Sequence, residues 1–249
     1  MKINIMTWNT RLYMMGNKVG NNRKEIDFEK TKEIFNYIKN YLEQNENSIA
    51  VLQEIPYFSN LKPIWELHEI FKMFCKIFDG YKILYNKGNQ IKMTVVITKS
   101  KDLICEDCKN NVNNNRFVAF NLCGTNFSVL GVHSHDAFDL REALKNNTYL
   151  YFPNLILGDF NAGNYRKKDI NADKQISVNR QNYLLLTEFY IDLIQGEYTT
   201  NYTNCEQTQI DHILLENCIE NCSYGNIKID RKMTLSDHFP ISFELEIAT

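Results

Sequence analysis

Asn154-Leu155-Ile156-Leu157-Gly158-Asp159-Phe160-Asn161 joins a short apolar run to a polar cluster. The run Asn154–Leu157 has the length and composition of a buried strand, and glycine and asparagine at its end are residues that turn a chain sharply. Ser236-Asp237-His238 lies beside another predicted strand, one residue before the stretch Pro240–Ile247, which alternates in polarity. Both patterns predict strands of a buried sheet with polar side chains gathered at one end.

Other short runs alternate in polarity or are rich in β-branched and aromatic residues, which is typical of strands. Together these patterns predict strands at Ile3–Trp8, Ile49–Gln53, Tyr81–Tyr85, Met93–Thr98, Phe117–Leu122, Phe127–Val132, Asn154–Leu157, Ile210–Leu215 and Pro240–Ile247. Cys123-Gly124-Thr125-Asn126 predicts a tight hairpin between its two flanking strands. Apolar residues at helical spacing predict a helix at Glu25–Glu43, and weaker spacing predicts helices at Ile64–Phe78, Leu140–Tyr151 and Val178–Ile194. Hairpins mixed with strand–helix–strand segments favour two packed sheets with helices outside over a doubly wound parallel sheet.

The bulk properties bound the class of protein. The chain has 249 residues, of which 44% are hydrophobic, and no linker rich in Pro, Gly or Ser divides it, so we expect a single folded domain over residues 1–249. The net charge of −2 excludes a globally basic nucleic-acid binder and leaves room for a locally basic cleft. The seven cysteines show no disulfide framework, and neither a signal peptide nor an apolar run of about 18 residues is visible. We expect a monomeric cytoplasmic protein that does not associate with membranes.

Polar clusters stand wherever a predicted strand ends. They are Trp8-Asn9, Gln53-Glu54, His133-Ser134-His135, Gly158–Asn161, Ile210-Asp211-His212 and Ser236-Asp237-His238. Taken alone, each has an ordinary structural explanation, because a carboxylate after a strand usually caps or turns the chain and a lone histidine is usually a packing residue. Taken together, they supply carboxylates suited to Mg²⁺ and amides and imidazoles suited to a phosphate or a water. Phosphoryl transfer needs all of these parts.

The ordered series Trp8-Asn9, Leu52-Gln53-Glu54, Val132-His133, Gly158-Asp159-Phe160-Asn161, Ile210-Asp211 and Ser236-Asp237-His238 resembles the endonuclease/exonuclease/phosphatase family, which includes deoxyribonuclease I. The resemblance runs from Asn9 to His238, nearly the whole chain. It implies a four-layer α/β/β/α sandwich of two mixed, mainly antiparallel sheets flanked by helices. It also implies hydrolysis of a phosphoester by water with Mg²⁺ or Mn²⁺ as cofactor.

The resemblance also implies a role for each motif residue. Glu54 would be the principal metal ligand, with Asn9 and Asp237 near the same ion or a second one. Asp159 would orient or deprotonate the attacking water, and Asn161 would hold that water and touch the phosphate. His238 would contact the scissile phosphate while Asp211 accepts its other ring proton, and His133, or else His135, would be the second histidine. Which of Asp159, His133 and His238 moves the proton stays open.

Basic residues follow several of the motifs. Arg11 stands where apurinic endonucleases of this family carry an acidic residue, which disfavours an abasic-site specialist. Arg116 resembles an arginine that some members direct at substrate. The run Arg166-Lys167-Lys168 follows Asn161, and Arg231-Lys232 precedes Ser236. Each cluster alone is explained by solvated loop charges, but a basic rim around the motifs predicts phosphate contacts by Arg11, Arg116, Arg166 and Lys167.

These patterns leave three classes of function. The first is a nuclease acting on DNA or RNA. The second is a phosphatase or phosphodiesterase acting on a small phosphorylated molecule or a lipid headgroup with the same site. The third, a non-catalytic binding protein, is disfavoured because every expected acid, amide and histidine is present. A separate alternative is zinc at the pairs Cys105/Cys108 and Cys218/Cys222, whose uneven spacing favours incidental thiols instead.

Overall fold

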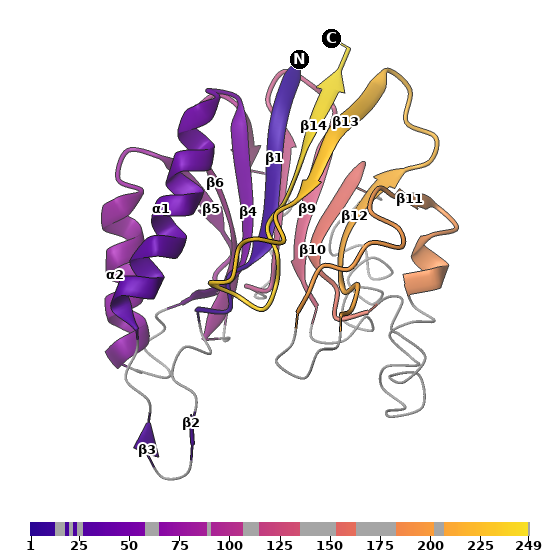
Figure 1. Ribbon diagram of the computed structural model, residues 1–249. Coiled ribbons are helices and arrows are strands. Elements are labelled where there is room, and N and C mark those ends of the chain that lie inside the picture. Colours follow the sequence, from indigo (N-terminus) through magenta and orange to yellow (C-terminus); the bar gives the residue numbers. More distant parts are fainter. Residues whose placement is uncertain are drawn as a thin grey trace.

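Two six-stranded sheets pack face to face in the computed structural model, and two long helices cover the outer face of one of them (Figure 1). The structure describes residues 1–12, 18–19, 22–23, 27–57, 65–88, 91–106, 115–134, 153–162, 183–201 and 207–248. Both termini lie at one edge of the sandwich, and strand β1 (Lys2–Asn9) runs from there to the opposite edge.

The first sheet has the strand order β13-β14-β1-β4-β6-β5. Its members are β1, β4 (Ser48–Pro56), β5 (Lys82–Tyr85), β6 (Lys92–Thr98), β13 (Cys222–Ile229) and β14 (Ile241–Ile247). The central pair β1 and β4 is parallel, and the other neighbours are antiparallel. Parallel pairing makes β1 and β4 end at the same edge, where Asn9 and Glu54 stand.

The second sheet has the order β11-β12-β10-β9-β8-β7. Its members are β7 (Ile104–Glu106), β8 (Phe117–Leu122), β9 (Ser128–His133), β10 (Leu155–Asp159), β11 (Tyr190–Asp192) and β12 (Asp211–Glu216). Here too the central pair, β9 and β10, is parallel within an otherwise antiparallel sheet. The two short strands β2 (Lys18–Val19) and β3 (Asn22–Arg23) form a separate hairpin.

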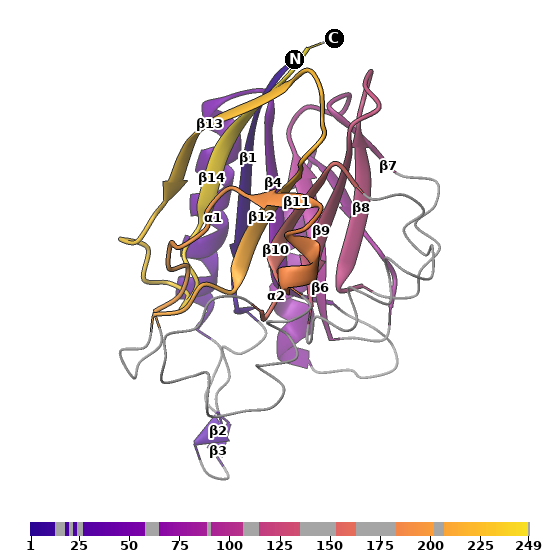
Figure 2. The same ribbon diagram turned by 90° about the vertical axis from the view of Figure 1, so that its right-hand side faces the viewer.

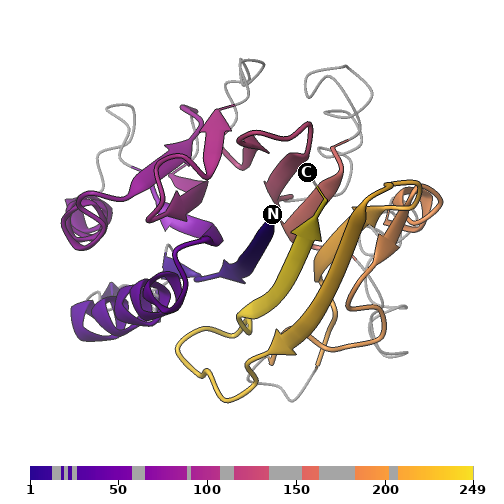
Figure 3. The same cartoon turned by 90° about the horizontal axis from the view of Figure 1, so that it is seen from above.

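The helices α1 (Phe28–Gln44) and α2 (Trp65–Ile77) lie side by side on the outer face of the first sheet, as the view from above shows (Figure 3). Asp27 caps α1 by accepting a hydrogen bond from the backbone N–H of Lys30 at 2.9 Å. The apolar face of α1 is buried and includes Ile34, Phe35 and Ile38. No helix in the described part of the chain is both long and apolar enough to cross a membrane.

Three apolar clusters hold these layers together. The largest fills the space between the sheets, with Ile5, Val51 and Leu157 among its members. The second joins the first sheet to α1 and α2. The third covers the outer face of the second sheet, where a helical turn at residues 183–186 lies against it (Figure 2). Gly131 of β9 is required at its place, because a Cβ there would approach the side chain of Val51 in the opposite sheet to 2.6 Å.

The predicted two-sheet sandwich is confirmed, as are every predicted strand and the hairpin at Cys123–Asn126. The predicted helices at Glu25–Glu43 and Ile64–Phe78 correspond to α1 and α2. The helix predicted at Val178–Ile194 is wrong at its C-terminal end, where Tyr190–Asp192 forms strand β11. The helix predicted at Leu140–Tyr151 lies outside the described residues. Strands β2, β3, β7, β11 and β13 were not predicted.

Candidate active site

Strand pairing brings three titratable side chains together at one edge of the second sheet. Asp159 pairs in register with His133 of β9 on one side and with Asp211 of β12 on the other. In the first sheet, Asn9 is the last residue of β1, and Glu54 lies one residue beyond the register partner of Asn9 on β4. The predicted motifs from both sheets therefore meet at the same edge of the sandwich, the lower edge in Figure 1.

Asp159 is 2% exposed and is held by donors on both of its oxygens. Its Oδ2 accepts a hydrogen bond from Asn9 Nδ2 at 2.8 Å, and its Oδ1 accepts one from the backbone N–H of Asn161, also at 2.8 Å. Burial raises the pKa of Asp159, and the charge of Asp211 adds to the rise, against the opposing effect of the two site histidines. A carboxylate with a raised pKa is a better proton acceptor near neutral pH than a free one.

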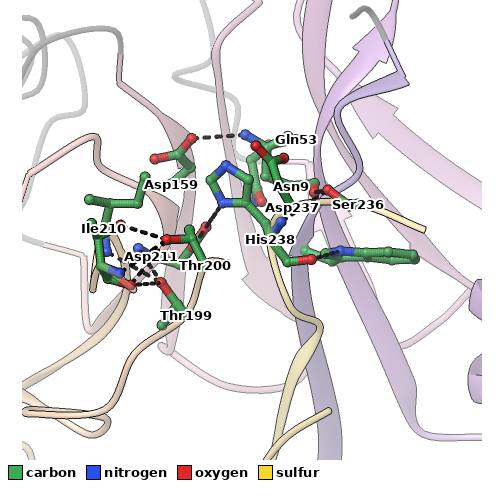
Figure 4. A network of polar contacts seen from close by, with 12 residues as sticks. Asn9, Gln53, Asp159, Thr199, Thr200, Ile210, Asp211, Ser236, Asp237 and His238 are labelled. Carbon is green, nitrogen blue, oxygen red and sulfur yellow. Dashed lines mark hydrogen bonds and ion pairs between the residues drawn. The ribbon is translucent and has the colours of Figure 1, made fainter. Parts of the chain in front are cut away.

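His238 forms a buried pair with Asp211. The His238 Nδ1 atom lies 2.9 Å and 3.1 Å from the two carboxylate oxygens of Asp211, and the ring projects toward Asp159 and Asn9 (Figure 4). Burial lowers the pKa of His238, but the charge and hydrogen bond of Asp211, with the charges of Asp159 and Glu54, outweigh it and raise the pKa to about 9. The imidazole is therefore a cation at neutral pH in this arrangement.

The loop that carries His238 is anchored to β1. The indole Nε1 of Trp8 donates to the carbonyl oxygen of His238 at 2.9 Å, and the hydroxyl of Ser236 donates to the carbonyl oxygen of Asn9 at 2.9 Å. The same Ser236 hydroxyl accepts the backbone N–H of His238 at 3.2 Å. The serine of the Ser-Asp-His motif therefore joins the histidine to the asparagine motif at the end of β1.

Glu54 is placed by an irregularity in the first sheet. The register between β4 and β6 shifts between Leu52 and Ile55, and Glu54 in this bulge has φ +58°. Its Oε1 accepts hydrogen bonds from Lys92 Nζ at 2.9 Å and lies 3.2 Å from His133 Nε2. Burial raises the pKa of Glu54, but these two partners more than reverse the effect and lower it to about 2.

Gly158 and Asn161 give the motif turn its unusual backbone. Gly158 has φ +134°, and a Cβ at this position would come within 2.1 Å of the carbonyl oxygen of Val132. Asn161 has φ +48°, a conformation that asparagine tolerates better than most residues. The side-chain nitrogen of Asn161 donates to the carbonyl oxygen of Ser134 at 2.6 Å, so this amide ties β10 to the end of β9.

Solved structures with a similar arrangement of elements include several nucleases and a 3′ phosphatase. The endonuclease domain of TRAS1, a telomere-specific non-LTR retrotransposon, is 13% identical to this chain with a TM-score of 0.64, and each chain is covered completely. The 3′–5′ exonuclease NExo from Neisseria meningitidis is 18% identical with a TM-score of 0.63 over 98% of this chain and all of the other. The apurinic endonuclease LMAP from Leishmania major is 11% identical with a TM-score of 0.69, over 99% of this chain and 88% of that one. The chain has the deoxyribonuclease I-like fold.

The likeness lies in structure and not in sequence. No known family profile matches the chain, and no curated protein sequence matches it. At identities of 11–18% the common property is the fold, so the roles of individual residues depend on the geometry of this chain.

The residues of the candidate site fit a hard divalent cation at Glu54. Among the described residues, Glu54 Oε2 and Asp237 Oδ1 are buried carboxylate oxygens without a hydrogen-bond partner, and such oxygens are the ligands that Mg²⁺ prefers. The described group of acidic and histidine side chains whose ligand atoms lie within 4.8 Å of one another is a different one, Asp159, Asp211 and His238. That group is less suited to a metal ion, because His238 is paired with Asp211 and a protonated imidazole does not coordinate a metal.

The basic residues predicted to contact substrate have different surroundings. Arg11, at φ +51°, forms an ion pair with Asp237 and is 36% exposed along its side chain. The carbonyl oxygen of Arg116 accepts the backbone N–H of His133 at 2.9 Å, which places this arginine beside the site. Arg231 pairs with Glu197 and stacks on the ring of Tyr198. The predicted contacts Arg166 and Lys167, together with Lys168 and His135, lie outside the described residues.

Two features of the site were missed in the sequence. Lys92, the cation that pairs with Glu54, stands at the start of an apolar strand and follows no recognisable motif. The network around His212, one residue after Asp211, joins strands that are distant in sequence. The zinc alternative gains no support, since no group containing cysteine is found among the described residues, which exclude Cys108.

Proposed function

We propose that this chain is a divalent-metal-dependent phosphoesterase that hydrolyses nucleic-acid phosphodiester bonds by in-line attack of water. The observation that carries the proposal is the buried cluster in which Asp159, bound by Asn9, lies within 4.8 Å of the His238–Asp211 pair. A proton acceptor beside a buried cation supplies two of the requirements for this chemistry, activation of water and neutralisation of negative charge.

In this mechanism Asp159 receives the proton of the attacking water. Its raised pKa favours this role, and the hydrogen bonds from Asn9 and from the Asn161 backbone orient its carboxylate. Asn161 lies at the same turn and restrains the water and the phosphate.

His238 neutralises the charge of the phosphate, and His133 is the second histidine beside it. The cationic ring of His238 is held by Asp211, so it needs no rearrangement to meet the negative charge that develops on the phosphate oxygens. His133 contacts Glu54 and Asp159, which links the two halves of the site. Mg²⁺ or Mn²⁺, when held by Glu54 with Asn9 and Asp237 beside it, supplies a Lewis acid for the same oxygens.

A nucleic-acid substrate is favoured by the structural neighbours and by the basic residues. The neighbours are a retrotransposon endonuclease, a 3′–5′ exonuclease and an apurinic endonuclease, and the Neisseria protein is also described as a 3′ phosphatase bound to a product DNA hairpin. Arg11, Arg116, Arg166 and Lys167 are the residues we assign to phosphate contacts. Arg11 still argues against a specialist for abasic sites.

The decisive experiment is a substrate panel with Mg²⁺ and with Mn²⁺. It compares single- and double-stranded DNA, RNA, a 3′-phosphorylated oligonucleotide and bis-p-nitrophenyl phosphate. We expect cleavage of a polynucleotide that excess EDTA abolishes, and a loss of turnover of at least about 100-fold in His238→Ala and in Asp159→Asn. Asp79→Asn, at an exposed turn after α2, is the matched control and should retain full activity. Full turnover in either site variant would show that the site is assigned wrongly.

Salt dependence separates a polynucleotide from a small phosphorylated substrate. Neutralising Arg166, Lys167 and Lys168 together should weaken polynucleotide cleavage and flatten its dependence on salt, because fewer counterions are released on binding. Neutralising the exposed lysines Lys76, Lys99 and Lys101 is the matched control. Activity confined to bis-p-nitrophenyl phosphate or to a lipid headgroup, with no salt effect in either triple variant, would favour the alternative substrate class.

We also propose that residues 1–249 fold as one domain and act as a monomer in the cytoplasm. The continuous core between two sheets built from both ends of the chain supports a single folding unit. A single cooperative unfolding transition and a monomeric mass in size-exclusion chromatography with light scattering are the expected results.

A further inference from the structure

A third histidine, His212, lies behind the candidate site and its two histidines, on the outer face of the second sheet. His212 is fully buried, and both of its ring nitrogens contact oxygen atoms. Nδ1 lies 2.8 Å from Asp192 Oδ2, and Nε2 lies 2.6 Å from the carbonyl oxygen of Ala162. A carbonyl oxygen accepts hydrogen bonds only, and so does an ionised carboxylate. Nε2 therefore donates to the carbonyl oxygen of Ala162, and the ring contacts two segments of the chain at once.

The position of His212 follows from strand geometry. Neighbouring residues of a strand face opposite sides of a sheet, so Asp211 points toward the site and His212 points away from it. The register partner of His212 on β10 is Gly158, which has no side chain to fill the space. The His212 ring lies instead between Tyr183 and Phe160, with centroid distances of 4.3 Å and 5.2 Å.

Asp192 holds this histidine in place and is itself well supplied with donors. Its Oδ2 accepts the hydroxyl of Tyr183 at 2.6 Å and the Nε2 of Gln209 at 3.1 Å, in addition to His212. Burial raises the pKa of Asp192, but the charge and hydrogen bond of His212 and the Tyr183 hydroxyl reverse the effect and lower it. The carboxylate therefore accepts hydrogen bonds from the Tyr183 hydroxyl and from Gln209 Nε2 while it contacts His212 Nδ1.

The segment that His212 contacts is the turn of residues 158–162, which carries the Gly-Asp-Phe-Asn motif of the candidate active site and is called the motif turn. Along this turn, Asp159 and Asn161 carry the polar groups of the site, while Phe160 and Ala162 are buried in the outer apolar cluster. Phe160 packs its ring against the edge of His212, and Ala162 accepts the hydrogen bond of Nε2. Asn161 lies between these two anchors in a left-handed conformation, with its backbone N–H donating to Asp159.

We propose that His212 is a positioning residue that fixes the carbonyl group of Ala162, one residue beyond Asn161, and thereby holds the backbone amide of Asn161 on the proposed base, Asp159. The inference rests on the proposed function, since it assumes that Asp159 and Asn161 serve catalysis. Its structural part, that the hydrogen bond to Ala162 controls the order of the motif turn, can be measured without any substrate.

Two substitutions of His212 separate its two hydrogen bonds. His212→Gln places an amide donor about where Nε2 lies and so retains the bond to Ala162. His212→Asn places a donor about where Nδ1 lies and so retains only the bond to Asp192. Both variants lose the packing of the ring. A purely structural histidine would make the two variants equivalent, whereas a positioning role predicts that glutamine rescues and asparagine does not.

The expected kinetic result is a difference in kcat. For His212→Asn we expect kcat to fall by roughly 10- to 100-fold with little change in KM, because the misplaced groups act on the transition state and not on binding. For His212→Gln we expect a fall of less than about fivefold. Equal losses of kcat in the two variants would overturn the proposal.

Hydrogen exchange gives the readout that does not depend on activity. The backbone amide of Asn161 should exchange faster in His212→Asn than in the wild type, and at nearly the wild-type rate in His212→Gln. If no substrate is cleaved by the wild type, the proposed function fails while this comparison still tests the positioning role. Equal exchange at Asn161 in both variants would reject the positioning role even in an active enzyme.

A second pair of variants covers the case in which both His212 variants unfold. Asp192→Asn removes the charge that orients His212 and should lower kcat and speed exchange at Asn161. Tyr183→Phe removes one donor from the same carboxylate, leaves the contact between His212 and Ala162 in place and should lower the unfolding midpoint with kcat retained. Parallel losses of stability and kcat in both variants would contradict the proposal.

Discussion

Replacing Asp211 by asparagine tests the electrostatics of the site directly. The substitution keeps the shape of the side chain and removes the negative charge that lies 2.9 Å from His238 Nδ1. In the wild type this charge and hydrogen bond are the first of the effects that raise the pKa of His238 from 6.5 to about 9. Without the charge and hydrogen bond of Asp211, only Asp159 and Glu54 oppose the lowering effect of burial, and we expect the pKa of His238 to fall.

The magnitude follows from the shift. A difference of roughly 2.5 pKa units between the folded and unfolded chain is worth about 3 kcal/mol at about 1.4 kcal/mol per unit. Because the folded pKa is the higher one, the folded protein binds the proton more tightly. The stabilisation is therefore complete below pH 6.5, decreases as pH rises through the window from 6.5 to about 9, and is absent above it.

The assay is urea unfolding of wild type and Asp211→Asn in EDTA at intervals from pH 6 to pH 10. We expect the difference in unfolding free energy between the two proteins to shrink over this range by up to about 3 kcal/mol. Asp79→Asn, at an exposed position, should show a constant difference from the wild type. A wild-type advantage over Asp211→Asn that stays constant or grows toward pH 10 would refute a charged pair between His238 and Asp211.

Three further changes test other parts of the site. Glu54→Gln should weaken Mn²⁺ binding at least about tenfold in isothermal titration calorimetry. Lys92→Met removes the cation that pairs with the Glu54 carboxylate and should tighten Mn²⁺ binding by up to about tenfold, or about 1.4 kcal/mol. Unaltered Mn²⁺ binding in both variants would remove Glu54 from the metal site. Gly158→Ala should lower the unfolding free energy by about 3 kcal/mol or more, against about 1 kcal/mol for Gly124→Ala, whose added Cβ meets nothing within 4 Å; equal losses would contradict the steric argument. Folding raises the pKa of Asp159, so the wild type loses stability as rising pH ionises this carboxyl group. Asp159→Asn has no such loss, and its unfolding temperature relative to the wild type should be higher at pH 8 than at pH 4. The reverse trend would contradict the raised pKa.

The strands could be predicted because each is a short run that either alternates in polarity or is rich in apolar residues. Every residue of β4 is buried, and β10 is buried throughout. By contrast, β13 alternates between exposed and half-buried residues at the edge of its sheet and includes Gly225 and Asn226 at a register shift, so it carries no strong strand signal.

The false helix at Val178–Ile194 had a physical reason. Tyr183, Leu186, Tyr190 and Ile194 follow helical spacing and are buried or partly buried, which satisfies an amphipathic pattern. The chain nevertheless turns at residues 187–189 and continues as β11, so that the buried residues reach the core from two different elements. Periodicity does not distinguish one continuous helix from two short elements that bury the same residues.

The motifs predicted which residues gather at the site but not how each is held. The pairing of Asp211 with His238 was predicted from the resemblance and is present in the structure. The ion pair of Arg11 with Asp237 and the contact of Lys92 with Glu54 join residues separated by tens or hundreds of positions. Such contacts depend on side-chain directions at a bulge or a left-handed residue, which no local pattern specifies.

The site is also the place where the two sheets are joined by polar contacts. Asn9 of the first sheet donates to Asp159 of the second, and Glu54 of the first contacts His133 of the second. Apolar contacts between the two faces have little directional preference, whereas these polar contacts require one relative position of the two sheets. The turn Gly158–Asn161 therefore meets Asn9 only when the sandwich has closed correctly. The geometry of the candidate site and the alignment of the sheets depend on the same hydrogen bonds, and loss of Asn9 would affect both.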